Sequence, residues 1–319
     1  MGILNLNEDS FFAASRTKAN EVAARAARLF EEGADVIDLG ACSTRPGSQQ
    51  PDVEEEWRRL EPALRELLEV EGYSLPGVCA PPHRGRGRGP QIFGYFRREL
   101  ASGENVQKAV GGAGVKRSVT ESPGREYPSI SIDTFRAEIV RRTYDTIGPF
   151  LVNDISAGHL DPEMLETVGR LGLPYVAMHM RGTPENMQQL TDYTDIVKDI
   201  EAYFREFAQM AEEAGIKEWI LDPGFGFAKT IEQNYELMRR MNELKEAFPQ
   251  EILVGVSRKS MIYKVLGITP EEAMPATQVL NFAALERGAT WLRVHDVAPA
   301  VQTAQLYSTM YTSSPGAAK

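Results

Sequence analysis

The 319-residue chain contains 42% hydrophobic and 25% charged residues, a composition typical of a globular protein with a full hydrophobic core. Its formal net charge of −10 argues against general nucleic-acid binding, and its two cysteines are too few for a disulfide scaffold. The first residues lack a signal-peptide pattern, and no apolar run approaches the roughly 20 residues that span a membrane. We therefore expect a cytoplasmic protein that binds neither membranes nor nucleic acid.

Short apolar runs alternate along the chain with longer amphipathic stretches. The runs predict strands over residues 2–6, 34–40, 129–133, 150–155, 174–180, 219–224, 252–257 and 291–297. The stretches predict helices over residues 17–32, 53–70, 135–147, 161–171, 193–214, 231–246, 271–287 and 298–311. Near-continuous apolar strands suit a parallel sheet that is covered on both faces.

This order of elements predicts an α/β fold, the (β/α)8 or TIM barrel. An open doubly wound sheet is the alternative. It usually carries a Gly-rich phosphate-binding turn after its first strand, and the sequence has no such turn there.

Residues 73–128 interrupt the alternation between the second helix and the third strand. The segment is rich in Gly, Arg, Pro and Ser, and its nine basic and four acidic residues give it a net charge of +5. Because so long a loop is unusual in a compact domain, we interpret it as an insertion into one barrel domain spanning residues 1–319. A helix-to-strand connection lies opposite the catalytic face of a barrel, which favours a solvated insertion over an Arg-Gly contact with nucleic acid.

Polar residues stand at the end of every predicted strand. They are Asn5, Asp38, Asp133, Asn153, Asp154, His179, Asp222, the run Ser257-Arg258-Lys259-Ser260, and Arg293, His295 and Asp296. Because the strands of such a barrel all end at its catalytic face, these side chains are expected to converge on one rim. Charges gathered there are costly unless they pair with each other or with a ligand.

One set of side chains at or near this rim is cationic or proton-donating: Arg45, Lys259, Arg293 and His295. Such groups suit a phosphate or a diphosphate. Asn5 adds an amide oxygen, which can serve a Mg2+ ion that bridges a diphosphate. The rim therefore predicts an anion pocket with Mg2+ as cofactor.

A second set supplies acceptors and an amide: Asp133, Asn153 and Asp222. These groups suit a flat heterocycle with ring N–H and amino donors. The Gly-Phe-Gly-Phe segment at 224–227 adds backbone freedom and aromatic walls for stacking. Two carboxylates also allow glycoside hydrolysis as an alternative, which the neighbouring Lys and Arg side chains fit poorly. The sequence has no zinc-binding pair, P-loop or G-x-S-x-G elbow.

Ordered motifs along the chain resemble the dihydropteroate synthases, a family of pterin-binding TIM barrels. They are GILN at 2–5, DSF at 9–11, DLGACSTRPG at 38–47, SIDT at 131–134, NDIS at 153–156, MHM at 178–180, DPGFGFAK at 222–229, GVSRKSMI at 255–262 and RVHDV at 293–297. The resemblance implies a transferase of folate biosynthesis. Its substrates would be 6-hydroxymethyl-7,8-dihydropterin diphosphate and 4-aminobenzoate, and its products 7,8-dihydropteroate and diphosphate.

The resemblance also implies a role for each matching residue. The pterin would contact Asp133, Asn153, Ile155, Met178, Asp222, Lys259 and Arg293. The diphosphate would contact Asn5, Arg45, Arg293 and His295, with Asn5 as the Mg2+ ligand. The 4-aminobenzoate site, where sulfonamides would compete, would consist of Thr44, Arg45, Pro46, Phe227 and Ser260. The catalytic set would be Asp133, Asp222, Lys259, Arg293 and His295.

Two related functions stay open at this point. A methyltetrahydrofolate methyltransferase on the same barrel would share the pterin residues without needing the anion and aminobenzoate sets. A non-catalytic relative would bind pterin without turnover. The family also forms dimers through late helices, so we expect a homodimer. Its face could be supplied by Met274, Val279, Leu280 and Phe282, or these residues could simply belong to the core. Cys42, which stands where the family often has Glu, is expected to be a small buried thiol.

Overall fold

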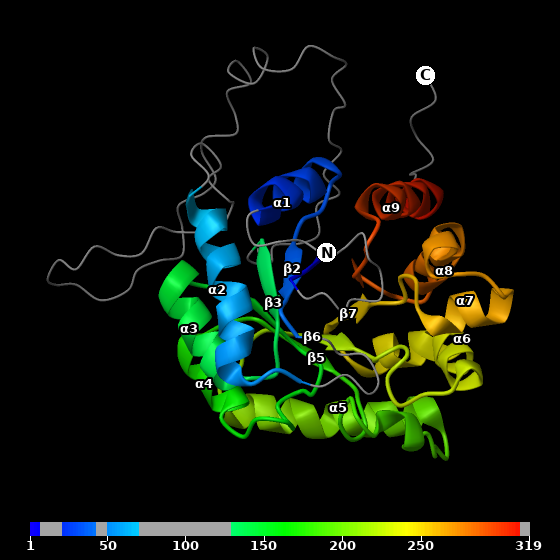
Figure 1. Cartoon of the computed structure of the whole chain (residues 1–319). Helices are drawn as coiled ribbons and strands as arrows, with labels where there is room; N and C mark the ends of the chain where they lie inside the picture. Colours follow the sequence, from blue (N-terminus) through cyan, green and yellow to red (C-terminus); the bar gives the residue numbers. More distant parts are fainter. Residues whose placement is uncertain (7–20, 43–49, 70–128, 313–319) are drawn as a thin grey trace, which may run out of the picture. The chain divides into compact units, whose positions relative to one another are not determined.

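The computed structural model describes residues 1–6, 21–42, 50–69 and 129–312. Eight strands form one sheet in the order β1 to β8, and each pairs in parallel with the next (Figure 1). The strands are β1 Gly2–Asn5, β2 Ile37–Gly40, β3 Ile130–Asp133, β4 Leu151–Asp154, β5 Tyr175–Met178, β6 Trp219–Asp222, β7 Glu251–Val254 and β8 Trp291–Leu292.

The sheet closes on itself between its first and last strands. A parallel bridge joins Gly2 to Val294, just beyond β8. Across it, the backbone N–H of Ile3 donates to the carbonyl of Val294, and that of Val294 to the carbonyl of Met1, both at 3.0 Å. The prediction of a (β/α)8 barrel is therefore confirmed.

Helices alternate with the strands and lie outside them (Figure 1). The helices are α1 Val22–Glu31, α2 Val53–Glu69, α3 Ala137–Ile147, α4 Met164–Leu171, α5 Ile196–Glu213, α6 Ile231–Ala247, α7 Ser260–Leu266, α8 Met274–Glu286 and α9 Val297–Thr312, with short 3-10 turns at Met187–Gln189 and Glu271–Ala273. Local caps begin two of them: Asp195 accepts hydrogen bonds from the first turn of α5, and Thr230 forms a capping box with Gln233 in α6. None of the helices in the described ranges is both long and apolar enough to cross a membrane.

The structure corrects several predicted boundaries. The strand predicted over 291–297 ends at Leu292, and the one predicted over 252–257 ends at Val254. Residues 255–258 stay buried beyond the end of β7, and beyond β8 the isolated bridge at Val294 continues the pairing, so each apolar run is longer than its strand. Helix α7 was not predicted, because seven residues are too few for a periodic signal. The predicted insertion at 73–128 lies outside the described residues.

Side chains on a strand alternate between its two faces, and this two-residue repeat explains why a layer of polar side chains lies on a layer of apolar ones, the apolar floor, inside the barrel. The barrel interior holds one apolar cluster: Met1, Val36, Leu151, Val176, Ile220 and Leu253, with Trp291 packed against it. Six residues each follow a member of this cluster by two positions in the sequence: Asp38, Asn153, Met178, Asp222, Gly255 and Arg293. Because side chains two apart on a strand face the same side, this second set lies directly above the floor. The outward side chains pack with the helices in the large core.

Candidate active site

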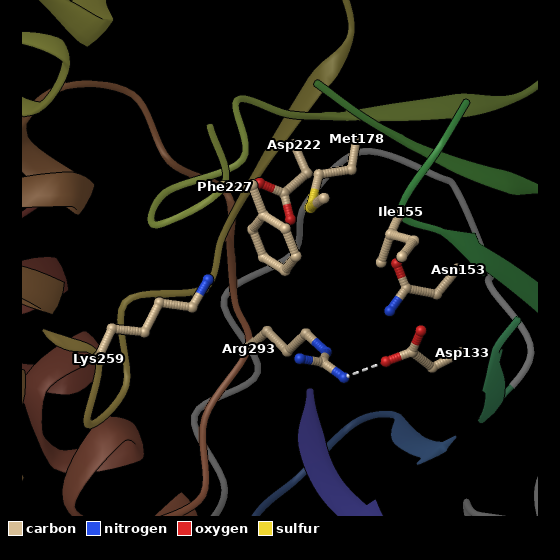
Figure 2. Close-up of a pocket in the computed structure, with 9 residues that line it drawn as sticks. Asp133, Asn153, Ile155, Met178, Asp222, Phe227, Lys259 and Arg293 are labelled. Atoms are coloured by element: carbon tan, nitrogen blue, oxygen red, sulfur yellow. Dashed lines mark hydrogen bonds and ion pairs between the residues drawn. The ribbon is translucent and has the colours of Figure 1, made fainter. Parts of the chain in front are cut away.

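A pocket opens at the carboxyl ends of the barrel strands (Figure 2). It is lined by Asp133, Asn153, Ile155, Met178, Asp222, Phe227, Gly255, Lys259 and Arg293. The lining contains all seven residues expected to hold a pterin, so the structure brings them together around one cavity.

Register across the sheet places the polar groups side by side. Asp133, the last residue of β3, pairs with Gly40 on one neighbouring strand and with Asn153 on the other. Met178 pairs in the same way with Asp222. The parallel strands thus present an aspartate, an amide and a second aspartate around the same opening.

An apolar wall stands next to these polar groups. Ile155 and Met178 belong to a small buried cluster with Met180, Met187 and Ala228, against which Phe227 packs. In Figure 2 the ring of Phe227 and the side chains of Ile155 and Met178 face the same cavity as the two aspartates. Apolar walls beside a few convergent polar groups suit a flat, hydrogen-bonding ring.

Arg293 is held by two carboxylates. Its Nε donates to Oδ2 of Asp38 at 2.7 Å, and its Nη2 donates to Oδ2 of Asp133 at 2.8 Å, the contact drawn in Figure 2. The fully buried Asp38 also accepts hydrogen bonds from Ser131 Oγ at 2.6 Å and Asn153 Nδ2 at 3.0 Å. Asp38 therefore orients both an arginine and an amide of the pocket. Its position at the rim follows from the sequence, whereas its orienting role appears only in the structure.

Burial shifts the ionisation of the groups in the pocket. It raises the pKa of Asp133 to about 7, against the opposing charge of Arg293. It also raises the pKa of Asp222, an effect that the charge of Lys259 and the N–H of Gly224 oppose. Conversely, burial lowers the pKa of Lys259 to about 8, and the charge of Asp222 opposes that shift. The pocket therefore holds groups that titrate close to neutral pH, as functional sites often do.

His295 is not among the lining residues and contacts Ser257. Its Nδ1 is 3.0 Å from Ser257 Oγ, which also accepts from the backbone N–H of His295. Burial, with the charge of Arg293 as the next cause, lowers the pKa of this imidazole to about 3. The ring is therefore neutral near pH 7. It can donate a hydrogen bond to an anion but brings no charge.

The remaining predicted residues fall into three groups. The Asn5 side chain lies beside the pocket, because a methyl group placed on Gly40 would be 3.5 Å from Asn5 Oδ1 and 3.6 Å from Asp133 Cβ. Phe227 lines the pocket, whereas Ser260 begins α7 and is not among the lining residues. Thr44, Arg45 and Pro46 lie outside the described residues.

Several other rim residues make structural contacts. Arg258 forms a two-pronged ion pair with Asp296, both bonds at 2.8 Å. Buried Asp154 accepts hydrogen bonds from the Tyr175 hydroxyl at 2.5 Å and from Ser156 Oγ at 2.7 Å. These contacts give structural partners to Arg258, Asp296 and Asp154, three charged residues that the sequence placed at the rim without a role.

Cys42 is a small buried thiol, as expected. It is a free cysteine with 8% of its surface exposed, and Arg136 Nη1 donates to its Sγ at 3.3 Å. Burial raises its thiol pKa far above the usual value, so the reactive thiolate is disfavoured.

The family emerges from comparison with known proteins. The sequence profile described as "Pterin binding enzyme" matches residues 1–75 and 115–295. The dihydropteroate synthase of Synechocystis is 33% identical over 98% of this chain and 89% of its own length. The chain belongs to the dihydropteroate synthase family. The resemblance inferred from the motifs is confirmed, and with it the assignment to a transferase of folate synthesis.

Other dihydropteroate synthases support the same placement. The Yersinia pestis structure, solved with a sulfonamide drug, has 28% identity, covers 98% of this chain and 94% of its own, and gives a TM-score of 0.75. The Xanthomonas albilineans structure with 4-aminobenzoic acid has 29% identity, coverage of 98% and 93%, and a TM-score of 0.72. A longer relative, the folic acid synthesis protein fol1 of Pneumocystis carinii, is 36% identical over 93% of this chain, which spans 34% of that protein.

Proposed function

We propose that this pocket condenses 6-hydroxymethyl-7,8-dihydropterin diphosphate with 4-aminobenzoate. The proposal rests on the convergence of two carboxylates, an amide and a lysine on one cavity with an apolar wall. The solved relatives that hold 4-aminobenzoic acid or a sulfonamide support the choice of second substrate and competitor. No observation favours the methyltransferase alternative.

The first proposed task of the pocket is to hold the pterin ring. The ring would lie against Ile155, Met178 and Phe227. Its N–H and amino groups would donate to the carboxylates of Asp133 and Asp222. Because the site is buried and its dipoles are already oriented, these contacts cost little reorganisation during the reaction.

The second task is to stabilise the charge that develops during bond breaking. As the bond between the pterin methylene carbon and the diphosphate oxygen breaks, both electrons leave with the diphosphate and the carbon becomes positive. The ring spreads this charge, and the negative field of Asp133 and Asp222 stabilises it. The amine of 4-aminobenzoate then attacks the carbon with its lone pair and loses a proton. Water must be kept out, because it would compete as the nucleophile.

The third task is to bind the leaving group. Within the described part of the chain, Nη1 of Arg293 has no hydrogen-bond partner, whereas Nε and Nη2 are engaged with aspartates. We propose that Nη1 and a ring N–H of His295 contact the diphosphate. Arg45 would add a second cation from outside the described residues.

Mg2+ fits the donor set as a partner of the diphosphate. No cluster of three or more His, Cys, Asp or Glu side chains that could hold a metal ion occurs among the described residues. Mg2+ often takes only one or two protein ligands and fills its remaining positions with water and substrate phosphates. The carboxamide oxygen of Asn5, next to Asp133, is the proposed protein ligand. When bound, the ion would neutralise charge on the leaving group.

Diphosphate release tests the proposal directly. We expect purified protein to release diphosphate from the pterin substrate only when 4-aminobenzoate is present. Chelation of Mg2+ should reduce that release, and sulfamethoxazole should compete with 4-aminobenzoate. A folded protein that binds the pterin but releases nothing would instead be the non-catalytic relative. Cytoplasmic location stays a prediction from the sequence.

We also propose a homodimer through α8 and α9, which pack side by side. Of the four residues expected at this face, only Val279 is largely exposed, at 68%. Helix α9 adds Leu306, Met310 and Tyr311, each more than half exposed. These α9 residues are not among the four expected from the sequence. Such a concentration of exposed apolar side chains is typical of an interaction surface.

Charged substitutions should separate such a dimer. We expect the double variant Val279→Asp, Leu306→Asp to run as a monomer in light scattering at micromolar concentration, because each carboxylate would be buried without a partner. Leu68→Asp, a matched change on α2, should leave the mass unchanged. A monomeric wild-type protein would contradict the proposal.

A further inference from the structure

Lys229, the last residue of the DPGFGFAK motif, has no part in the chemistry proposed above. It ends the loop between β6 and α6, yet its side chain is only 4% exposed. Nζ donates to the carbonyls of Gly224 at 2.9 Å and Phe227 at 3.0 Å, and lies 3.0 Å from Nδ1 of His179, just beyond β5. One nitrogen therefore links both ends of the loop to a neighbouring strand.

The number of donors matches the number of partners in either protonation state. A lysine ammonium has three N–H donors, enough for the two carbonyls and an unprotonated Nδ1. A neutral amine would donate to the two carbonyls and accept from Nδ1–H. Burial lowers the pKa of both Lys229 and His179 well below their usual values, and the charge of Asp222 opposes the shift at Lys229. The link therefore persists whether or not it carries a charge.

The loop that this link holds carries three features of the pocket. The N–H of Gly224 donates to Asp222 Oδ1 at 2.8 Å, and the carbonyl of Phe225 accepts from Lys259 Nζ at 2.5 Å. The ring of Phe227 lies under the same Nζ, 4.8 Å from its centroid. A shift of the loop would thus displace contacts to an aspartate, a lysine and an aromatic wall together.

The loop also packs tightly on the strand end. Gly224 has a φ of +71°, and a methyl group on it would lie 2.0 Å from the carbonyl oxygen of His179. The backbone of the loop therefore touches the same residue whose ring contacts Lys229. There is no room for a side chain on Gly224 at this junction, and Lys229 reaches it from the end of the loop.

We propose that Lys229, acting through His179, is a positioning residue that holds loop 223–228 in the conformation that completes the pterin pocket. This inference rests on the proposed function for the identity of the ligand, whereas the conformation of the loop can be measured without any ligand.

The test combines amide hydrogen exchange with calorimetric titration of the pterin diphosphate. In Lys229→Met, we expect exchange in residues 223–228 to speed up at least 10-fold while the barrel strands keep their protection. The Kd for the pterin should rise by about 10- to 100-fold, the usual effect of losing a supporting contact behind a site. Lys217→Met, the same change at an exposed position before β6, should match the wild type in both measurements.

Two further variants keep the test decisive if Lys229→Met does not fold. His179→Asn retains a polar group close to the position of Nδ1 and should behave nearly like the wild type, whereas His179→Phe removes it and should loosen the loop. Equal exchange in these two variants, or faster exchange spread over the whole barrel in Lys229→Met, would overturn the inference. A wild type that does not bind the pterin would refute the proposed function, and the exchange results would still decide the role of Lys229.

Discussion

Replacing Lys259 with methionine is expected to lower kcat/KM for the pterin substrate by about 100- to 1,000-fold, the usual effect of removing a preorganised electrostatic contact. Nζ of Lys259 lies in the pocket, bound to the carbonyl of Phe225 and above the ring of Phe227. Its charge is also the largest influence that opposes the raised pKa of buried Asp222. The substitution therefore removes a donor from the pocket and destabilises the carboxylate beside it.

The ionisation of Lys259 should also affect the pH dependence of kcat/KM, which reports the ionisation of the free enzyme. Since burial lowers the pKa of Lys259 to about 8, its ammonium form is lost as the pH rises through that value. Since burial raises the pKa of Asp133 to about 7, its carboxylate form appears as the pH rises through 7. We expect activity to rise near pH 7 and fall above pH 8, and the alkaline fall to be missing in Lys259→Met.

Steady-state assays of diphosphate release from pH 5.5 to 10 would measure both effects. Lys264→Met is the matched control, because it makes the same change at an exposed position on α7. A Lys259→Met variant with activity within 3-fold of the wild type would exclude the proposed role of this lysine.

Replacing Arg293 with methionine is expected to lower the free energy of unfolding by about 3–5 kcal/mol, the usual cost of breaking a buried ion pair from one side. Asp38 is fully buried and Asp133 is 12% exposed by its side chain, so both carboxylates would lose their main cationic partner. Urea denaturation at pH 8 would measure the loss. Arg239→Met, on the exposed face of α6, should be close to neutral.

A second substitution and a change of pH should both relieve this loss. Asp38→Asn removes one of the two stranded charges, so the double variant should be more stable than Arg293→Met alone. The folded-state pKa of Asp133 lies above its unfolded value, so its contribution to stability is present at low pH and is lost as the pH rises through about 7. The deficit of Arg293→Met should therefore be smaller at pH 5 than at pH 8. An equal deficit at both values would show that the loss comes from packing rather than charge.

The barrel and most of the pocket could be predicted because both follow from local spacing. Alternation of apolar runs and amphipathic stretches identifies the strands and helices, and strand ends converge in this fold. The two-residue repeat places Asp222 above Ile220 and Asn153 above Leu151, so a polar layer over an apolar floor is already present in the order of the residues. Pterin binding by these residues stays a prediction, as do the roles of Thr44, Arg45 and Pro46.

The partners within the site were decided only by the tertiary structure. Arg293 and Asp38 are 255 positions apart, and Lys229 and His179 are 50 apart, so no periodicity relates them. Their contacts arise because barrel closure brings distant strand ends together. Burial then sets the charge states: it lowers the pKa of His295, a cation candidate by residue type, to about 3, with the charge of Arg293 as the next cause, so the ring is neutral near pH 7. The amino-acid sequence by itself determined the fold, the family and the residues gathered at the pocket. The hydrogen-bonding partners and the ionisation states of those residues were decided by the tertiary structure, because both the contacts between distant strand ends and the burial of the side chains depend on closure of the barrel.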